Sequence, residues 1–159
     1  AGGRMGDAKS AQERLDAENA MDLSPELKGA RAAYFDALDD GEQVEEKKFT
    51  YAWTLIHQKS KEDMRAGIKL LEELSASKGV QRDALYYQAT AQYRLEMYMD
   101  SRKSLQHLLT IDPNNRQALD MKALVESVLQ REGAIGLAVF SSAAVAVAAL
   151  AGVLLKARR

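Results

Sequence analysis

The sequence predicts an all-α protein made of paired amphipathic helices and followed by one apolar, membrane-spanning helix. Three observations predict this architecture. Apolar residues recur at helical spacing over most of the chain, a set of residues repeats after 34 positions, and an uncharged run of 23 residues lies near the C-terminus. Two prolines and ten glycines among 159 residues provide few turns for a many-stranded sheet.

The repeat consists of four residue pairs, and the members of each pair are 34 positions apart. The pairs are Met64 and Tyr98, Gly67 and Ser101, Leu71 and Leu105, and Leu74 and Leu108. This period is the signature of tetratricopeptide repeats, in which a small residue on the second helix lets the first helix of the unit approach closely. We therefore predict a tetratricopeptide-like array of about six helices, with two repeats and capping helices.

The helices can be assigned in order along residues 24–132, which we predict to form one domain. They are expected at Ser24 to Asp40, Glu45 to Lys59, Lys61 to Leu74, Val80 to Leu95, Met97 to Ile111 and Asn115 to Glu132. The first has an apolar stripe of Leu27, Ala30, Tyr34 and Leu38, and the last caps the array. Residues 1–23 have no apolar run, so we expect a flexible or marginally helical extension there.

Residues 133–155 are predicted to cross a membrane. Ser141 and Ser142 are the only polar side chains in this segment. At about 1.5 Å per residue, a helix of this length spans roughly 34 Å, enough for a hydrocarbon core of about 30 Å. A buried core helix is the alternative, but such helices seldom run so far without a polar face. Because only residues 156–159 follow, we expect a tail-anchored protein whose domain faces the cytosol.

The short basic tail of residues 156–159 is the predicted targeting signal. Eight of the 23 residues in the span are alanine and three are glycine, so the span is only moderately hydrophobic. Such a span followed by Lys156, Arg158 and Arg159 is typical of tails sorted to the mitochondrial outer membrane. The alternative is that these side chains only reach the lipid headgroups and do not direct targeting.

Charge and composition exclude several classes of function. Residues 1–132 contain 19 basic and 23 acidic side chains, and a net charge of −4 disfavours binding to nucleic acid. The chain has no cysteine, and His57 and His107 do not have the spacing of metal ligands on one helix. Phosphate-binding glycine motifs are also missing from the sequence. We therefore expect a binding protein without cofactor, metal site or catalytic residues.

Several motifs resemble those of the mitochondrial fission 1 protein family. They are Lys48-Phe-Thr-Tyr-Ala-Trp-Thr-Leu-Ile56, Arg65-Ala-Gly-Ile-Lys-Leu-Leu-Glu-Glu-Leu74, Gln81-Arg-Asp, Tyr93-Arg-Leu95, Leu108-Leu109 and Pro113-Asn114-Asn115. Their order, the two-repeat length and the basic tail all agree with the family over residues 24–159. Ala91 and Ser101 depart from the usual residues, and the N-terminal extension is longer than the family needs.

The resemblance implies an adaptor of the mitochondrial outer membrane, and also of peroxisomes, that recruits a dynamin-related GTPase or its bridging adaptor. By resemblance, the concave groove that binds the partner contains Leu55, Tyr87, Ala89 and Arg94. Four of six tyrosines lie between Tyr86 and Tyr98, so aromatic rings either floor this groove or belong to the repeat core. The alternative function is a structural accessory subunit of a larger membrane complex, and weak homo-oligomers are compatible with either function.

Overall fold

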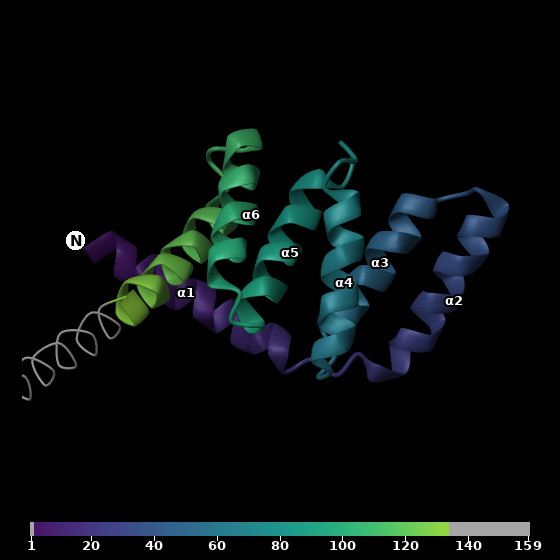
Figure 1. The fold of residues 1–159 in the computed structure, drawn as a ribbon, viewed down its shortest axis with the longest axis horizontal. Coiled ribbons are helices and arrows are strands. Elements are labelled where there is room, and N and C mark those ends of the chain that lie inside the picture. The colour runs from purple at the N-terminus through teal and green to yellow at the C-terminus, as the bar shows by residue number, and fades with distance from the viewer. Residues whose placement is uncertain (1, 134–159) are drawn as a thin grey trace, which may run out of the picture. The chain divides into compact units, whose positions relative to one another are not determined.

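The structure, a computed structural model, describes residues 2–133, and this part of the chain is helical with no strand (Figure 1). Six helices precede residue 112: α1 (Gly2–Asn19), α2 (Ser24–Asp40), α3 (Val44–Ile56), α4 (Lys61–Leu74), α5 (Gln81–Arg94) and α6 (Tyr98–Ile111). A last helix covers residues 116–133. The chain up to Glu126 forms one compact unit, to which the packing described below belongs.

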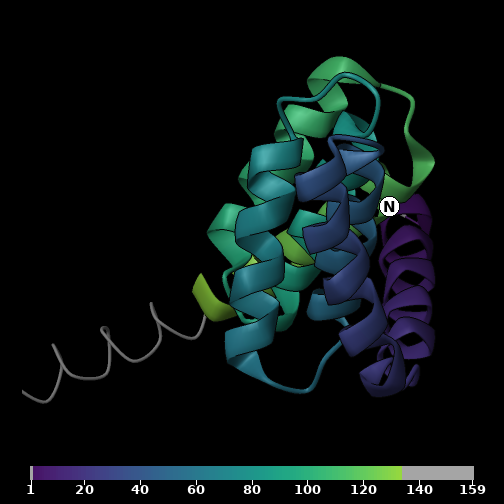
Figure 2. The same ribbon diagram turned by 90° about the vertical axis from the view of Figure 1, so that its right-hand side faces the viewer.

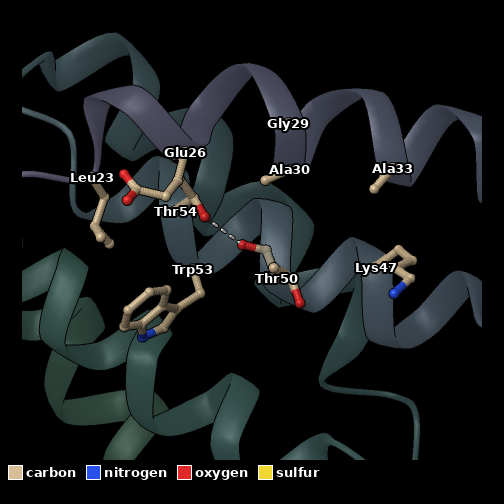
Figure 3. Close-up of a pocket in the computed structure, with 9 residues that line it drawn as sticks. All are labelled: Leu23, Glu26, Gly29, Ala30, Ala33, Lys47, Thr50, Trp53 and Thr54. Carbon is tan, nitrogen blue, oxygen red and sulfur yellow. Dashed lines mark hydrogen bonds between the residues drawn. The ribbon is translucent and has the colours of Figure 1, made fainter.

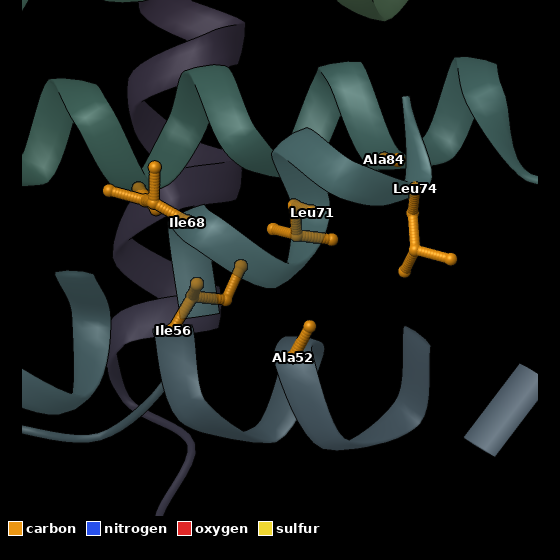
Figure 4. Close-up of a cluster of buried hydrophobic side chains, with 7 residues drawn as sticks. Ala52, Ile56, Ile68, Leu71, Leu74 and Ala84 are labelled. Atoms are coloured by element: carbon orange, nitrogen blue, oxygen red, sulfur yellow. The ribbon is translucent and has the colours of Figure 1, made fainter. Parts of the chain in front are cut away.

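Consecutive helices from α2 to α6 pack against one another, as the two views in Figures 1 and 2 show. α3 and α4 form the first repeat, and α5 and α6 form the second. This arrangement confirms the predicted all-α, tetratricopeptide-like array. Residues from both repeats enter one apolar core: Ala52, Ile56, Ile68, Leu71, Leu74, Ala84 and Ala91 are buried together (Figure 4).

Side-chain and glycine signals explain three of the helix ends. The hydroxyl of Ser60 accepts a hydrogen bond from the Asp63 amide at 3.2 Å, so Ser60 caps the start of α4. Gly41 ends α2 with a φ of 74°, a conformation that favours glycine. α3 ends at Ile56, three residues before the predicted Lys59. Its end is fixed by Gln58, whose side-chain amide donates to the carbonyls of Thr54 and Leu23.

The position of Gly67 confirms why the repeat needs a small residue there. A Cβ atom at Gly67 would lie 2.6 Å from Ile56 Cγ2 and 2.9 Å from the carbonyl oxygen of Ala52. α3 and α4 therefore cross at a distance that leaves no room for a side chain. At the equivalent position of the second repeat, the fully buried Ser101 donates a hydrogen bond of 2.8 Å to the Ala89 carbonyl.

Two expectations from the sequence need correction. Residues 2–19 form an 18-residue helix in which Ala11 and Leu15 are buried, whereas we expected a flexible or marginally helical extension. The mostly polar composition hid the pair, whose four-residue spacing places both side chains on one helix face. Leu38 does not continue the inward stripe of α2, because it is 47% exposed and Ala37 is buried in its place.

The predicted span at 133–155 lies outside the described residues from position 134 onward. The basic residues Lys156, Arg158 and Arg159 lie outside them too. Within the part of the chain that is described, no helix has both the length and the apolar character needed to cross a bilayer. Membrane anchoring and tail-directed targeting therefore remain predictions from the sequence.

Candidate partner-binding site

An aromatic cluster lies where α3 and α5 meet. Trp53 and Tyr87 are 34 positions apart, so they occupy equivalent places in the two repeats, and their ring centroids are 6.4 Å apart. Phe49 contacts the edge of Tyr87 with a centroid distance of 6.0 Å. Tyr87 is half-buried, and burial raises the pKa of its hydroxyl, with a further contribution from the charge of Glu18. This cluster of aromatic rings is partly accessible, which suits recognition of a peptide.

His57 connects this cluster to helix α1. Its imidazole packs on Trp53 with a centroid distance of 4.4 Å, and its Nδ1 lies 2.7 Å from the carbonyl oxygen of Trp53. Its Nε2 lies 3.8 Å from a carboxylate oxygen of Glu18 on α1. The ring is buried, so His57 acts here as a packing residue that also contacts α1.

α1 covers the side of α5 that carries the other tyrosines. Arg14 pairs with Asp120 of the last helix at 3.1 Å and also hydrogen-bonds Tyr86. Burial of the Arg14 guanidinium lowers its pKa, but the hydrogen bonds to Asp120 and Tyr86 and the charges of these two groups together outweigh burial, so the pKa is raised. Tyr86 is only 7% exposed, and Asp120 is buried as well. The second repeat therefore has little free surface on this side.

An open pocket lies beside the first repeat instead (Figure 3). It has a volume of about 340 Å³ and is formed between α2 and α3. Its lining residues are Leu23, Glu26, Gly29, Ala30 and Ala33 on the α2 side, and Lys47, Thr50, Trp53 and Thr54 on α3. The small side chains of α2 create the space, and Trp53 joins the pocket to the aromatic cluster.

The pocket has one acidic end and one basic end. Glu26 and Lys47 lie at opposite ends of it in Figure 3, and the residues between them are small, apolar or hydroxyl-bearing. A segment with a cation at one end and an anion at the other would match this arrangement. The volume falls at the lower end of the roughly 300–1,000 Å³ usual for ligand pockets, so it fits one or a few side chains.

The four residues assigned to the groove by family resemblance fall into two groups. Leu55 and Ala89 are 3% and 0% exposed, and the Cβ of Leu55 packs beside Gly67 between the helices of its repeat. Tyr87 and Arg94 are both partly exposed and lie near Glu18, whose charge acts on both. Leu55 and Ala89 thus present almost no surface to a partner.

Arg94 also has a structural role that the sequence did not reveal. Its guanidinium donates a hydrogen bond to the carbonyl of Ile56, at the end of α3. Burial lowers its pKa, and the charge of Glu18 partly opposes that shift. Because the last carbonyls of a helix lack partners within the helix, this contact caps α3 and ties it to α5.

Comparison with known proteins identifies the family. The profile for the Fis1 N-terminal tetratricopeptide repeat matches residues 47–78, and that for the Fis1 C-terminal tetratricopeptide repeat matches residues 82–134. The mitochondrial fission 1 protein of Bos taurus is 33% identical over 144 residues, covering 89% of this chain and 90% of the relative. That of Mus musculus is 40% identical over 109 residues, covering 67% of this chain and 72% of the relative.

The chain belongs to the mitochondrial fission 1 protein family. A crystal structure of Fis1 from Saccharomyces cerevisiae has a TM-score of 0.66 and 25% identity, covering 77% of this chain and 95% of the yeast chain. A second crystal structure holds yeast Fis1 in complex with an Mdv1 fragment containing the N-terminal extension and coiled coil domains. It has a TM-score of 0.63 and 25% identity, covering 75% of this chain and 94% of that one.

The two matched repeat profiles coincide with the two helix pairs that form the repeats in the structure. One repeat profile covers most of α3 and all of α4, and the other covers α5, α6 and the last helix. Among residues 2–133, no group of three or more histidine, aspartate or glutamate side chains could hold a metal ion.

Proposed function

We propose that this Fis1-family protein is an adaptor of mitochondrial division that binds a segment of a bridging protein in the pocket between α2 and α3. The open pocket beside Trp53 is the observation that carries the proposal, and on the second repeat Arg14 of α1 lies against Tyr86. The yeast relative crystallised with an Mdv1 fragment supports the idea that family members hold a bridging partner.

The proposed partner segment follows from the chemistry of the pocket. The partner segment places small apolar side chains beside Gly29 and Ala33. It also carries a basic group that faces Glu26 and an acidic group that faces Lys47. An amphipathic helix or an extended strand can present this pattern. Tyr87 extends the contact toward α5. Arg94 joins α5 to the end of α3 through its hydrogen bond to Ile56 and so holds these two helices in position.

The finer parts of the proposal come from the sequence and the family. Residues 133–155 anchor the protein in the mitochondrial outer membrane, and in peroxisomes, with the helical domain in the cytosol. The bridging partner links the adaptor to a dynamin-related GTPase. Anchoring concentrates many copies of the adaptor on one membrane surface. Partner binding that is weak at each pocket is then sufficient to assemble a division complex.

Gly29→Leu provides a sharp test of the pocket. A Cβ atom at Gly29 meets no other atom within 4 Å, so leucine fills the pocket without disturbing the fold. Gly6→Leu is the matched control, because Gly6 is also helical, exposed and free of neighbours within 4 Å. Full-length protein is used to capture partners from native membranes in mild detergent, with quantification by mass spectrometry.

We expect Gly29→Leu to lose the captured bridging protein while Gly6→Leu retains it. Equal capture by both variants would show that the pocket does not bind the partner. The same experiment separates the adaptor from a structural accessory subunit. If the protein is a permanent subunit, its partners still co-purify with it in fixed stoichiometry after extended washing. If it is a recruiter, washing removes them.

A further inference from the structure

We propose that His57 and Glu18 form a pH-sensitive contact, which fastens the last turn of α1 to the end of α3 when the imidazole takes up a proton. The atom that binds the proton is Nε2 of His57, which lies 3.8 Å from a carboxylate oxygen of Glu18. The inference is separate from the proposed partner pocket, because it concerns how α1 is held on the repeats.

A hydrogen bond orients the His57 ring and leaves Nε2 as the nitrogen that can titrate. Nδ1 lies 2.7 Å from the carbonyl oxygen of Trp53. Because a carbonyl oxygen only accepts, Nδ1 carries a hydrogen and donates it. In the neutral ring Nε2 therefore holds a lone pair, and this lone pair faces the carboxylate of Glu18. A proton on Nε2 converts two facing acceptors into an ion pair.

The contact lies where water screens it poorly. The side chain of His57 is 1% exposed and that of Glu18 is 22% exposed. Attraction between opposite charges is stronger when the pair is partly excluded from water. The imidazole also packs on Trp53 with a centroid distance of 4.4 Å, and a cationic ring is attracted to the face of an indole. Glu18 and Trp53 therefore both stabilise the protonated ring.

The groups of α5 that face His57 act in the other direction or not at all. The Tyr87 ring centroid lies 6.5 Å away, and Arg94 donates to the carbonyl of the neighbouring Ile56. The charge of Arg94 and the burial of the imidazole oppose protonation, whereas the charge of Glu18 favours it and also acts on Tyr87 and Arg94. The proton is therefore held only while the Glu18 carboxylate is in place.

The helices on the other sides of α3 bring no second acid to the ring. α4 packs Ile68 against Ile56 in the apolar core. α2 places Glu26 in the pocket that Trp53 also lines. Within residues 2–133, Glu18 is the acidic residue that forms an ion pair with His57. Uptake of the proton therefore acts on the attachment of α1 rather than on the packing between the repeats.

The other ion pairs of α1 do not respond to pH in the same range. Arg14 pairs with Asp120, and Asp7 pairs with Arg116. Carboxylates and guanidinium groups keep their charges between about pH 6 and 8, whereas histidine changes its charge there. The contact at Glu18 is thus present when the His57 ring is protonated, and it is lost as the pH rises and the proton leaves.

Hydrogen exchange of residues 10–19 tests this contact. Full-length protein in mild detergent is compared at pH 6 and pH 8 by mass spectrometry, with correction for the intrinsic pH dependence of exchange. We expect protection of these residues to be roughly threefold or more higher at pH 6. His57→Gln should lose this rise. His107→Gln is the matched control and should keep it, because His107 is the only other histidine and is exposed on α6.

Glu18→Gln tests the same contact without changing α3. A neutral amide can donate to the Nε2 lone pair at either pH, so protection should become independent of pH. In nuclear magnetic resonance titrations of the two imidazoles, His57 should also take up its proton at lower pH in Glu18→Gln than in the wild-type chain. Equal wild-type protection at both pH values, or a rise that His57→Gln or Glu18→Gln retains, would overturn the proposal.

Discussion

The two repeats share one scaffold but present different surfaces. Trp53 and Tyr87 occupy equivalent positions on α3 and α5, yet Trp53 lines an open pocket and Tyr87 lies near Glu18 of α1. The difference comes from the helices outside the repeats. α2 contributes glycine and alanine beside the first repeat, whereas α1 places Arg14 against Tyr86 of the second. The flanking helices thus decide which half of the array is accessible.

The two repeats also differ in the residue that lies where their two helices cross. Gly67 permits a crossing without any side chain, while Ser101 fills the equivalent space with a hydroxyl that is hydrogen-bonded to Ala89. On the surface, Lys48 pairs with Glu73 across the first repeat. The equivalent residues of the second repeat are Arg82 and His107, and Arg82 instead pairs with Asp112 at 3.6 Å. Four substitutions test these differences.

The largest effect is expected for Gly67→Leu. The crossing of α3 and α4 has no space for even one carbon, and the backbone oxygen of Ala52 cannot move without displacing α3. Unfolding free energy should fall by at least about 3 kcal/mol. Thermal denaturation followed by circular dichroism measures it. Gly29→Ala is the matched control and should stabilise by roughly 0.5–1 kcal/mol, because Gly29 is helical and unobstructed.

Removing Asp120 should release α1 from the second repeat. Asp120 is buried, accepts hydrogen bonds from Ser10 and Arg14, and pairs with Arg116. Asp120→Ala leaves Arg14 without its main partner and should cost about 2 kcal/mol. Limited proteolysis should then cut faster within residues 2–19. Glu126→Ala, on the same helix, should leave the cleavage rate unchanged, and equal rates in both variants would show that Asp120 does not hold α1.

Ser101→Ala should have a smaller effect. The substitution removes one buried hydrogen bond to Ala89 but keeps a small side chain at the crossing of α5 and α6. We expect a loss of about 1 kcal/mol in urea denaturation. A loss as large as that of Gly67→Leu would mean that the second repeat tolerates no change in volume at all.

Glu73→Gln should have the smallest effect, and a pH-dependent one. The hydrogen bond from Lys48 holds the pKa of the Glu73 carboxyl below its usual value. The pair therefore stabilises the fold above the unfolded pKa of Glu73, and this contribution is lost as the pH falls through the lowered folded value. Since Glu73 is exposed, we expect less than about 0.5 kcal/mol at pH 7. Denaturation curves of both proteins should converge at low pH.

The repeat architecture could be predicted because its signals are local and periodic. The 34-residue spacing located α4 and α6, and the predicted bounds of α2 and α4 agree with the structure. The placement of α1 could not be predicted, because Ala11 and Leu15 are the only buried apolar residues among residues 6–19, where the structure describes its side chains, and its contacts reach more than 100 positions along the chain to Asp120. The pocket was missed for a related reason. Gly29, Ala30 and Ala33 form it because their side chains are too small to fill the space between α2 and α3.

The side chains assigned by resemblance show the same limit. A motif can indicate that Leu55 and Ala89 belong to a helix facing a groove, but burial depends on how closely α4 and α6 approach. Likewise, the role of Arg94 at the end of α3 depends on a contact with Ile56, 38 residues away. Tyr87 and Trp53, at the surface between helices, remain the residues best placed to report on a partner.

Fluorescence of Trp53 tests the central claim most directly, because it is the only tryptophan in the chain and lines the pocket. A partner segment identified by capture is titrated into the full-length protein while the emission is recorded, and calorimetry measures binding independently. The pocket predicts a saturable shift of the emission to shorter wavelength, since the bound segment excludes water from the indole, and Gly29→Leu should abolish it. Calorimetric binding of the same segment without any change in Trp53 emission would contradict the account.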